Sequence, residues 1–386
     1  MATLCKQEDC TSCMACLNAC PFQAISVVEN DLSVKVPKID EQKCRECGLC
    51  EKSCPILSKS LGYNYPKEAI ALYTKDALDR HTCSSGGAAT ALARLVISRG
   101  GVVYGATAIN TYPKLIRVSK PEQLELLKGS KYVYCDTHLI YRSVKDDLVK
   151  GIECLFIGLP CQIAGLKQYL RKDYENLFTV DLICHGTPPF EYLRKHVESK
   201  IGEYKPDYCV SFRGKMDFST TVYDSDGSIV YTKNQYEDDY FAAFMRGWIY
   251  KPGCYSCRFA RPERVSDITI GDFWGLAQGA LNNYQGKVSV ALINSSKGEN
   301  LFIDCSDSFI WEKRTVEEAI SGNNQLRKPT TLSEEAKVFQ SVYYSTNSIS
   351  EAFKECGISK LIKKNRIRRM LLAFPKMVMR LIKPNK

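Results

Sequence analysis

Cysteine is the residue type in this sequence best suited to chemistry, and it is concentrated at one end of the chain. The chain has 386 residues and 19 cysteines, and nine of these lie within the first 54 residues. Eight of the nine form two runs of identical spacing, C-x-x-C-x-x-C-x-x-x-C-P, which begin at Cys10 and Cys44. In a reducing compartment, such a density predicts metal binding rather than disulfides. Cys5 lies outside both runs, and we interpret it as a bystander.

The two runs resemble the repeat of bacterial ferredoxins that hold two [4Fe-4S] clusters. The resemblance implies that the fourth cysteine of each run binds the cluster of the other run. One cluster would then be held by Cys10, Cys13, Cys16 and Cys54, and the other by Cys20, Cys44, Cys47 and Cys50. The alternative is structural zinc, because C-x-x-C pairs also form tetrahedral zinc sites. Two four-cysteine runs that each end in proline favour iron–sulfur clusters.

Further motifs lie in the body of the chain. Cys161 ends the segment Phe-Ile-Gly-Leu-Pro-Cys, and Cys184 lies within Asp-Leu-Ile-Cys-His-Gly-Thr. Cys254 and Cys257 form a C-x-x-C pair ahead of Ser-Asp-Ile-Thr-Ile-Gly-Asp-Phe-Trp-Gly at 266–275. Together with Ser84-Ser85-Gly86-Gly87 and Gly129-Ser130-Lys131-Tyr132-Val133, these segments resemble the coenzyme F-420 hydrogenase/dehydrogenase beta-subunit family. The resemblance covers most of residues 1–280 and implies an iron–sulfur oxidoreductase that binds FAD.

The four cysteines of the body predict a third [4Fe-4S] cluster. Cys161 follows an apolar segment and begins a helix, where the helix dipole favours a thiolate. Cys184 ends the next apolar segment, so in neighbouring parallel strands both sulfurs would lie at the carboxyl edge of the sheet. Cys254 and Cys257 would complete the set. The alternative is that Cys161 and Cys184 are ordinary buried cysteines.

Flavin-binding residues are expected on several loops. The Ser-Ser-Gly-Gly segment precedes a helix and suits a pyrophosphate, although a simple helix cap is the alternative. Lys131 and His185 are the candidate catalytic residues: the first to stabilise a reduced flavin, the second to deliver a proton or only to contact cluster sulfurs. The expected flavin-binding residues are Ser84, Ser85, Gly86, Gly87, Ser130, Lys131, Gly158, Asp272 and Trp274.

The elements that must position these residues follow from apolar patterning. From residue 68, apolar segments alternate with amphipathic ones, which predicts a largely parallel sheet flanked by helices. Ser225-Asp226-Gly227 predicts a hairpin between 221–223 and 229–232. The predicted strands are 69–73, 102–109, 154–158, 178–184, 268–270 and 288–293, and the predicted helices include 87–98, 144–149 and 190–201.

The sequence therefore predicts four parts. An α+β ferredoxin-like dicluster module (1–58) precedes a mixed α/β flavin-binding core (68–312). A mostly helical C-terminal segment (313–358) and a basic tail (359–386) follow. The net charge of +10 belongs to the tail, because 360–386 contain ten Lys or Arg and no acidic residue. The body is neutral, so no nucleic-acid partner is expected.

The tail mixes cations with apolar residues, which predicts peripheral contact with a membrane surface; a solvated tail or a docking segment is the alternative. No apolar run approaches the roughly 18 residues of a membrane-spanning helix. The N-terminal residues do not resemble a secretory signal, so we expect a cytoplasmic protein.

The expected function is electron relay. A one-electron partner such as ferredoxin would exchange electrons with the N-terminal clusters, and FAD would reduce or oxidise an organic substrate that the sequence does not identify. Two alternatives stay open: an electron-transfer subunit of a hydrogenase or dehydrogenase complex, and a reductase in cell-surface polysaccharide biosynthesis.

Overall fold

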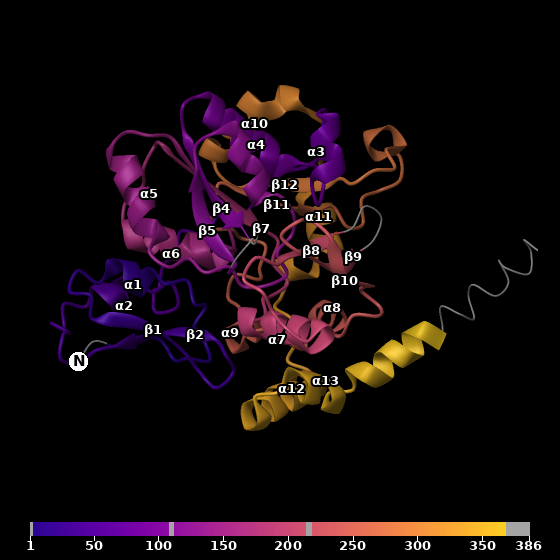
Figure 1. Cartoon of the computed structure of the whole chain (residues 1–386). Coiled ribbons are helices and arrows are strands. Elements are labelled where there is room, and N and C mark those ends of the chain that lie inside the picture. The colour runs from indigo at the N-terminus through magenta and orange to yellow at the C-terminus, as the bar shows by residue number, and fades with distance from the viewer. Residues whose placement is uncertain (1–2, 108–111, 214–217, 368–386) are drawn as a thin grey trace, which may run out of the picture.

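The computed structural model describes residues 3–107, 112–213 and 218–367. Figure 1 shows a small N-terminal module against one side of a larger body. The elements of the module are α1 (Ala15–Ala19), β1 (Ile25–Glu29), β2 (Lys35–Ile39) and α2 (Leu49–Lys52). β1 and β2 pair antiparallel, with Ile25 opposite Ile39. The predicted ferredoxin-like module is confirmed.

The body is built on an eight-stranded sheet of order β13-β3-β12-β11-β7-β6-β4-β5. The strands are β3 (Glu68–Thr74), β4 (Val102–Thr107), β5 (Lys114–Val118), β6 (Cys154–Gly158), β7 (Leu177–Leu182), β11 (Ile268–Asp272), β12 (Ser289–Ile293) and β13 (Phe309–Arg314). The pairs β4–β6, β6–β7 and β7–β11 are parallel, and the other four pairs are antiparallel. The sheet is therefore mixed, and the prediction of a largely parallel sheet is wrong at both flanks. β5 follows β4 after too few residues for a parallel crossover.

Helices cover both faces of this sheet. α4 (Ala88–Ser98) and α10 (Ser296–Cys305) pack on one face, where Leu155 of β6 is buried. α5 (Ile140–Val149) and α6 (Pro160–Leu170) pack on the opposite face against Cys154 and Phe156. The alternation along β6 follows from the two-residue period of a strand.

A second core lies beneath the sheet in Figure 1. A three-stranded sheet, β8 (Cys209–Arg213), β9 (Phe218–Tyr223) and β10 (Ile229–Asn234), confirms the predicted hairpin. Four helices surround an aromatic-rich core with it: α7 (Phe190–Ile201), α8 (Asp239–Met245), α12 (Glu334–Thr346) and α13 (Ile349–Glu355). The C-terminal helices therefore pack on the body. The shorter helices are α3 (Ala77–Thr82), α9 (Pro252–Tyr255) and α11 (Val316–Gly322).

The basic tail is only partly described. Residues 358–367 are helical, and the rest of the tail, 368–386, lies outside the described residues. Within residues 3–107, 112–213 and 218–367, every helix is too short or too polar to cross a bilayer.

Candidate functional site

The second cysteine run forms one side of a small cavity in the N-terminal module. Its lining includes Cys44, Cys47 and Cys50 from that run and Cys20 from the first run. Gly48, with φ +70°, allows the tight entry into α2 between Cys47 and Cys50. The exchange of fourth cysteines that the ferredoxin resemblance implies is compatible with this placement.

The first run and Cys54 form the other set of thiols. The buried Cys16 thiol has a pKa well above its usual range, because of burial first and then the nearby thiols of Cys13, Cys10 and Cys54. The backbone N–H of Ser12 donates to Cys10 Sγ at 3.4 Å. Ser12 and Met14 both adopt positive φ, at 60° and 58°. Such a turn directs amide hydrogens toward the sulfurs, a common feature of iron–sulfur sites.

Cys5, interpreted above as a bystander, lies in contact with this set. A hydrogen bond from Cys5 is the main cause that lowers the pKa of the Cys54 thiol to about 6. The same kind of bond from Cys5 is the main cause that lowers the pKa of the Cys10 thiol to about 7. Nothing in the spacing of the runs indicated this contact, because Cys5 precedes the repeat.

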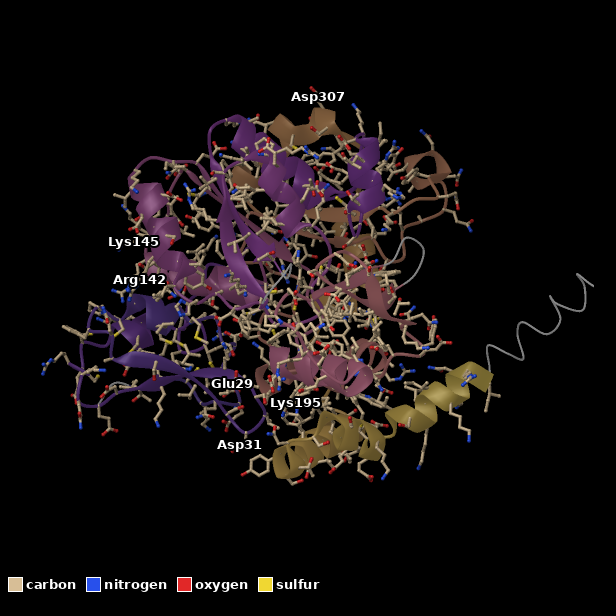
Figure 2. All side chains as sticks on the ribbon, in the orientation of Figure 1. Glu29, Asp31, Arg142, Lys145, Lys195 and Asp307 are labelled. Atoms are coloured by element: carbon tan, nitrogen blue, oxygen red, sulfur yellow. The ribbon has the colours of Figure 1, made fainter. Side chains whose placement is uncertain are left out.

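Side chains of the body hold the backbone of the first run. The Tyr134 hydroxyl donates to the carbonyl of Ser12, and Thr137 Oγ1 donates to the carbonyl of Cys13 at 3.0 Å. Figure 2 shows Arg142 where α5 faces the module. Its guanidinium donates to carbonyl oxygens at the end of α1, including that of Cys20 at 2.9 Å. Cations stabilise helix C-termini, so Arg142 fastens the module to the body.

The module approaches α6 closely at Gly165. A Cβ at Gly165 would lie 2.9 Å from Cys13 Sγ, so only glycine leaves room for the first run. A Cβ at Gly253 would similarly lie 3.0 Å from the carbonyl oxygen of Cys10. The first run is thus packed directly against the body near Cys254.

The four body cysteines line a single cavity at the carboxyl ends of β6 and β7. Gly158 of β6 is paired in parallel with Asp181 of β7, which brings the segments after both strands to one edge. Cys161, Cys184, Cys254 and Cys257 all line this cavity, which we call the cluster cavity. Cys10 and Thr11 of the module line it as well. The predicted convergence at one sheet edge is therefore found.

The predicted effect of the helix dipole on Cys161 is wrong in this structure. Cys161 occupies the first turn of α6, after Pro160, yet burial raises the pKa of its thiol well above the usual range. Burial also raises the pKa of Cys184 to about 12 and of Cys257 to about 11. Desolvation of the Cys161 thiol thus opposes the helix dipole, and a bound cation would favour its thiolate.

For the described residues, no three His, Cys, Asp or Glu side chains converge as the ligands of one metal ion would. Thiolates of a [4Fe-4S] cluster bind four different iron atoms, so they lie farther apart than the ligands of a single ion. All 19 cysteines are free of disulfides.

A larger cavity of about 310 Å³ lies beside the cluster cavity, and we call it the flavin cavity. Its lining includes most of the expected flavin-binding residues and both candidate catalytic residues. These are Ser84, Ser85, Gly87, Ser130, Lys131, Gly158, His185, Asp272 and Trp274. Cys83 and Cys135 line it too. Gly86 does not line the cavity: it packs against β3, where a Cβ would lie 2.4 Å from the Leu72 carbonyl oxygen.

The Ser-Ser-Gly-Gly segment presents polar groups at the start of α4. The buried Ser84 Oγ has no hydrogen-bond partner, whereas Ser85 Oγ accepts from Ser289 Oγ at 2.9 Å. Gly87 has φ +87° and caps α4 without a side-chain bond. Small residues, a free hydroxyl and a helix N-terminus suit a phosphate group.

Lys131 is a partly buried cation of the flavin cavity rather than a solvated surface charge. Its Nζ donates to the carbonyls of Leu127 and Lys128, both at 2.7 Å. Burial lowers the pKa of its ammonium to about 8. An ammonium has three donors, so one remains for a ligand.

Asp272 is paired with a cation that the sequence analysis missed. Arg213 Nη2 donates to Asp272 Oδ2 at 2.5 Å, and its Nε donates to the Tyr132 hydroxyl at 2.9 Å. Arg213 also lines the flavin cavity. Trp274, another lining residue, is 48% exposed to solvent. Arg213 stands in β8 in a segment without a motif, so no sequence signal pointed to it.

His185 lines both cavities. Its Nδ1 is 2.9 Å from Gln325 Nε2, and burial lowers the pKa of the imidazole below its usual range. The ring is therefore neutral near pH 7, and Gln325 fixes its orientation. Gln325 was also missed, because it comes from a distant segment.

Two family models match separate parts of the chain. Residues 152–319 match the family model for the C-terminal part of the beta subunit of coenzyme F420 hydrogenase/dehydrogenase, and residues 9–56 match a 4Fe-4S dicluster domain. A chain of the F420-reducing [NiFe] hydrogenase complex from Methanosarcina barkeri superposes with a TM-score of 0.46 at 16% identity, covering 77% of this chain and 91% of that one.

Curated relatives match only short stretches. A polyferredoxin-like protein of Methanocaldococcus jannaschii is 35% identical over 60 residues, which is 14% of this chain and 36% of that protein. The NADH-quinone oxidoreductase subunit I 2 of Symbiobacterium thermophilum is 37% identical over 62 residues, 14% of this chain and 26% of that protein. A ferredoxin of Pyrobaculum islandicum is 35% identical over 65 residues, 17% of this chain and 57% of its own length. The chain thus spans less than two thirds of each.

The dicluster match, the ferredoxin relative and the two sets of N-terminal thiols agree on a domain for [4Fe-4S] clusters at the N-terminal end of the chain. Residues 152–319 thus match the coenzyme F420 hydrogenase/dehydrogenase beta-subunit family, and residues 9–56 match a 4Fe-4S dicluster domain.

Proposed function

We propose that this protein is an iron–sulfur flavoprotein oxidoreductase that passes electrons between its [4Fe-4S] clusters and FAD and thereby reduces or oxidises an organic substrate. One observation carries the proposal: the cluster cavity and the flavin cavity share a wall, formed by Leu159 and residues 184–187. Bound clusters exchange single electrons, and a flavin converts these into the pairs that organic reductions need.

The residues of the cluster cavity fit a third [4Fe-4S] cluster. Four thiols from three separate segments line one cavity, which is the ligand number that such a cluster takes. Each is free of disulfides, and burial holds Cys161, Cys184 and Cys257 protonated until iron binds. Ordinary packing of four unrelated cysteines does not require them to meet at one cavity.

The residues of the flavin cavity fit FAD. The volume of about 310 Å³ is within the range of ligand sites. Ser84 and the start of α4 supply unpaired donors for a pyrophosphate. Lys131 supplies a cation that would stabilise negative charge on the flavin ring.

His185 is the residue we assign to proton transfer. It is neutral near pH 7, is held by Gln325, and lies on the wall that both cavities share. A neutral imidazole can accept a proton, and the imidazolium that forms can then donate it. Lys131, with its pKa lowered to about 8, is the second group able to do so.

A second candidate function is an electron-transfer subunit without a substrate of its own. The family description names a beta subunit, which favours docking to a catalytic partner. Co-purification of the chain with a stoichiometric oxidoreductase partner would support this alternative. A role in cell-surface polysaccharide biosynthesis and contact of the basic tail with a membrane stay predictions.

The test is anaerobic reduction of the protein by reduced ferredoxin, followed through the loss of flavin absorbance. We expect wild-type protein to bleach rapidly, and Cys257→Ser to keep its flavin but to bleach at least tenfold more slowly. Cys154→Ser is the control, because Cys154 is buried in β6 and does not line either cavity. Absence of flavin, or equal rates in wild type and Cys257→Ser, would refute the proposal.

A further inference from the structure

Lys251 is a buried lysine to which the functions above assign no role. It is only 3% exposed and immediately precedes α9, which carries Cys254. Its Nζ donates to the carbonyl of Thr11 at 2.9 Å and lies 3.4 Å from the centre of the Tyr134 ring. The ammonium therefore lies at the boundary between the body and the first cysteine run.

The ammonium of Lys251 faces two sets of thiols at once. On the body side it lines the cluster cavity together with Cys161 and Cys184. On the module side it contacts the residue that follows Cys10, and Cys10 lines the same cavity. Its charge therefore acts on both sets of thiols.

A buried ammonium is unfavourable unless nearby negative charge compensates it. In the part of the chain that the structure describes, no carboxylate lies within 4 Å of the Lys251 Nζ. One carbonyl and one aromatic ring compensate the charge only in part. Four thiolates around a [4Fe-4S] cluster carry net negative charge, and a set of four thiols lies on each side of this lysine.

We propose that Lys251 is a counter-ion shared by the site of Cys10, Cys13, Cys16 and Cys54 and by the cluster cavity, and that its charge raises the reduction potential at both. The inference rests on the proposed function for the second of these sites. Reduction adds negative charge, so a cation in a dry site favours the reduced state. A common counter-ion therefore shifts the two potentials in the same direction.

The test is a redox titration of the full-length anaerobic protein, followed by paramagnetic resonance. Lys251→Gln removes the charge and keeps an N–H donor for the Thr11 carbonyl. At a fixed solution potential, we expect the ratio of reduced to oxidised cluster to fall at least tenfold in two places: the site that contains Cys10 and the cluster cavity. For a one-electron couple, a tenfold fall corresponds to a reduction potential lower by about 59 mV. The couple of the Cys20, Cys44, Cys47 and Cys50 site serves as an internal reference and should not move.

Two further variants separate charge from packing. Lys251→Arg keeps the charge, so the ratio of reduced to oxidised cluster at both sites should stay within threefold of wild type. Lys52→Gln removes an exposed lysine that lies between Cys50 and Cys54 in sequence, and solvent screening should keep its effect below threefold. Unmoved couples in Lys251→Gln, or equal shifts in Lys251→Gln and Lys52→Gln, would overturn the proposal.

Cluster loss is also decisive. If Lys251→Gln and Lys251→Met lose iron while Lys251→Arg retains it, the requirement for a cation is supported; loss in all three would show a packing role and overturn the proposal. The iron content of wild type separates the two claims. About eight iron atoms per chain would refute the third cluster, and with it the proposal that two sites share Lys251. About twelve iron atoms, with reduction potentials that do not change in Lys251→Gln, would refute only the role of Lys251.

Discussion

Replacing Cys161 by serine should remove one cluster of three. Cys161 is one of four thiols that line the cluster cavity, and the other three cannot complete the ligand set of a cube. Anaerobically purified wild type should contain about twelve iron atoms and about twelve acid-labile sulfides per chain, four for each cluster. The variant should contain about eight of each. The N-terminal thiols are not altered, so the paramagnetic resonance of their two clusters should persist.

The matched control is Cys154→Ser. Cys154 is fully buried at the start of β6, the same strand that leads to Cys161, but it packs against α5 and α6 outside the cavity. This variant should keep about twelve iron atoms. An unchanged iron count in Cys161→Ser, or the same loss in both variants, would refute the assignment of Cys161 as a ligand.

Three further changes test the surroundings of the site. Gly165→Ala should lower the thermal unfolding temperature, because overlap with Cys13 costs about 1–3 kcal/mol, more than the gain of up to about 1 kcal/mol in helix propensity; a higher temperature would contradict the close contact. Arg142→Met should speed limited proteolysis at residues 58–67, which join the module to the body, since the module loses the hydrogen bonds that hold it to α5; an unchanged cleavage rate would contradict this. In the folded protein the pKa of Lys131 is about 8, below its ordinary value of 10.5. Burial of the charged ammonium therefore lowers the free energy of unfolding below pH 8, and this destabilisation disappears as the pH rises from 8 to 10.5. The stability of flavin-free wild type, measured by denaturant unfolding, should therefore rise across that window by at most about 3 kcal/mol relative to Lys131→Met, and parallel profiles would contradict it.

Local sequence patterns predicted those features that depend on residues close together in the sequence. The two cysteine runs repeat one spacing, and alternation of apolar segments was enough to place Cys161 and Cys184 at the same sheet edge. The bounds of α7 also follow from its own amphipathic pattern. These features depend on contacts between residues close in sequence or on the regular geometry of parallel strands.

The missed features depend on which distant segments pack together. Lys251 and Thr11 are 240 residues apart, and a lone lysine in an aromatic segment gives no sign of such a partner. Arg213 and Gln325 acquire their roles in the same way. The pKa of Cys161 was mispredicted because the helix dipole is local, whereas desolvation depends on the whole fold around the thiol.

The most direct test of the account is the cofactor content of the wild-type chain, purified without oxygen and analysed for iron, sulfide and heat-released flavin in one sample. The shared wall of the two cavities predicts about twelve iron atoms, about twelve sulfides and about one FAD per chain. A colourless preparation without flavin, or flavin-free protein with only about eight iron atoms, would contradict the coupling of a body cluster to a flavin.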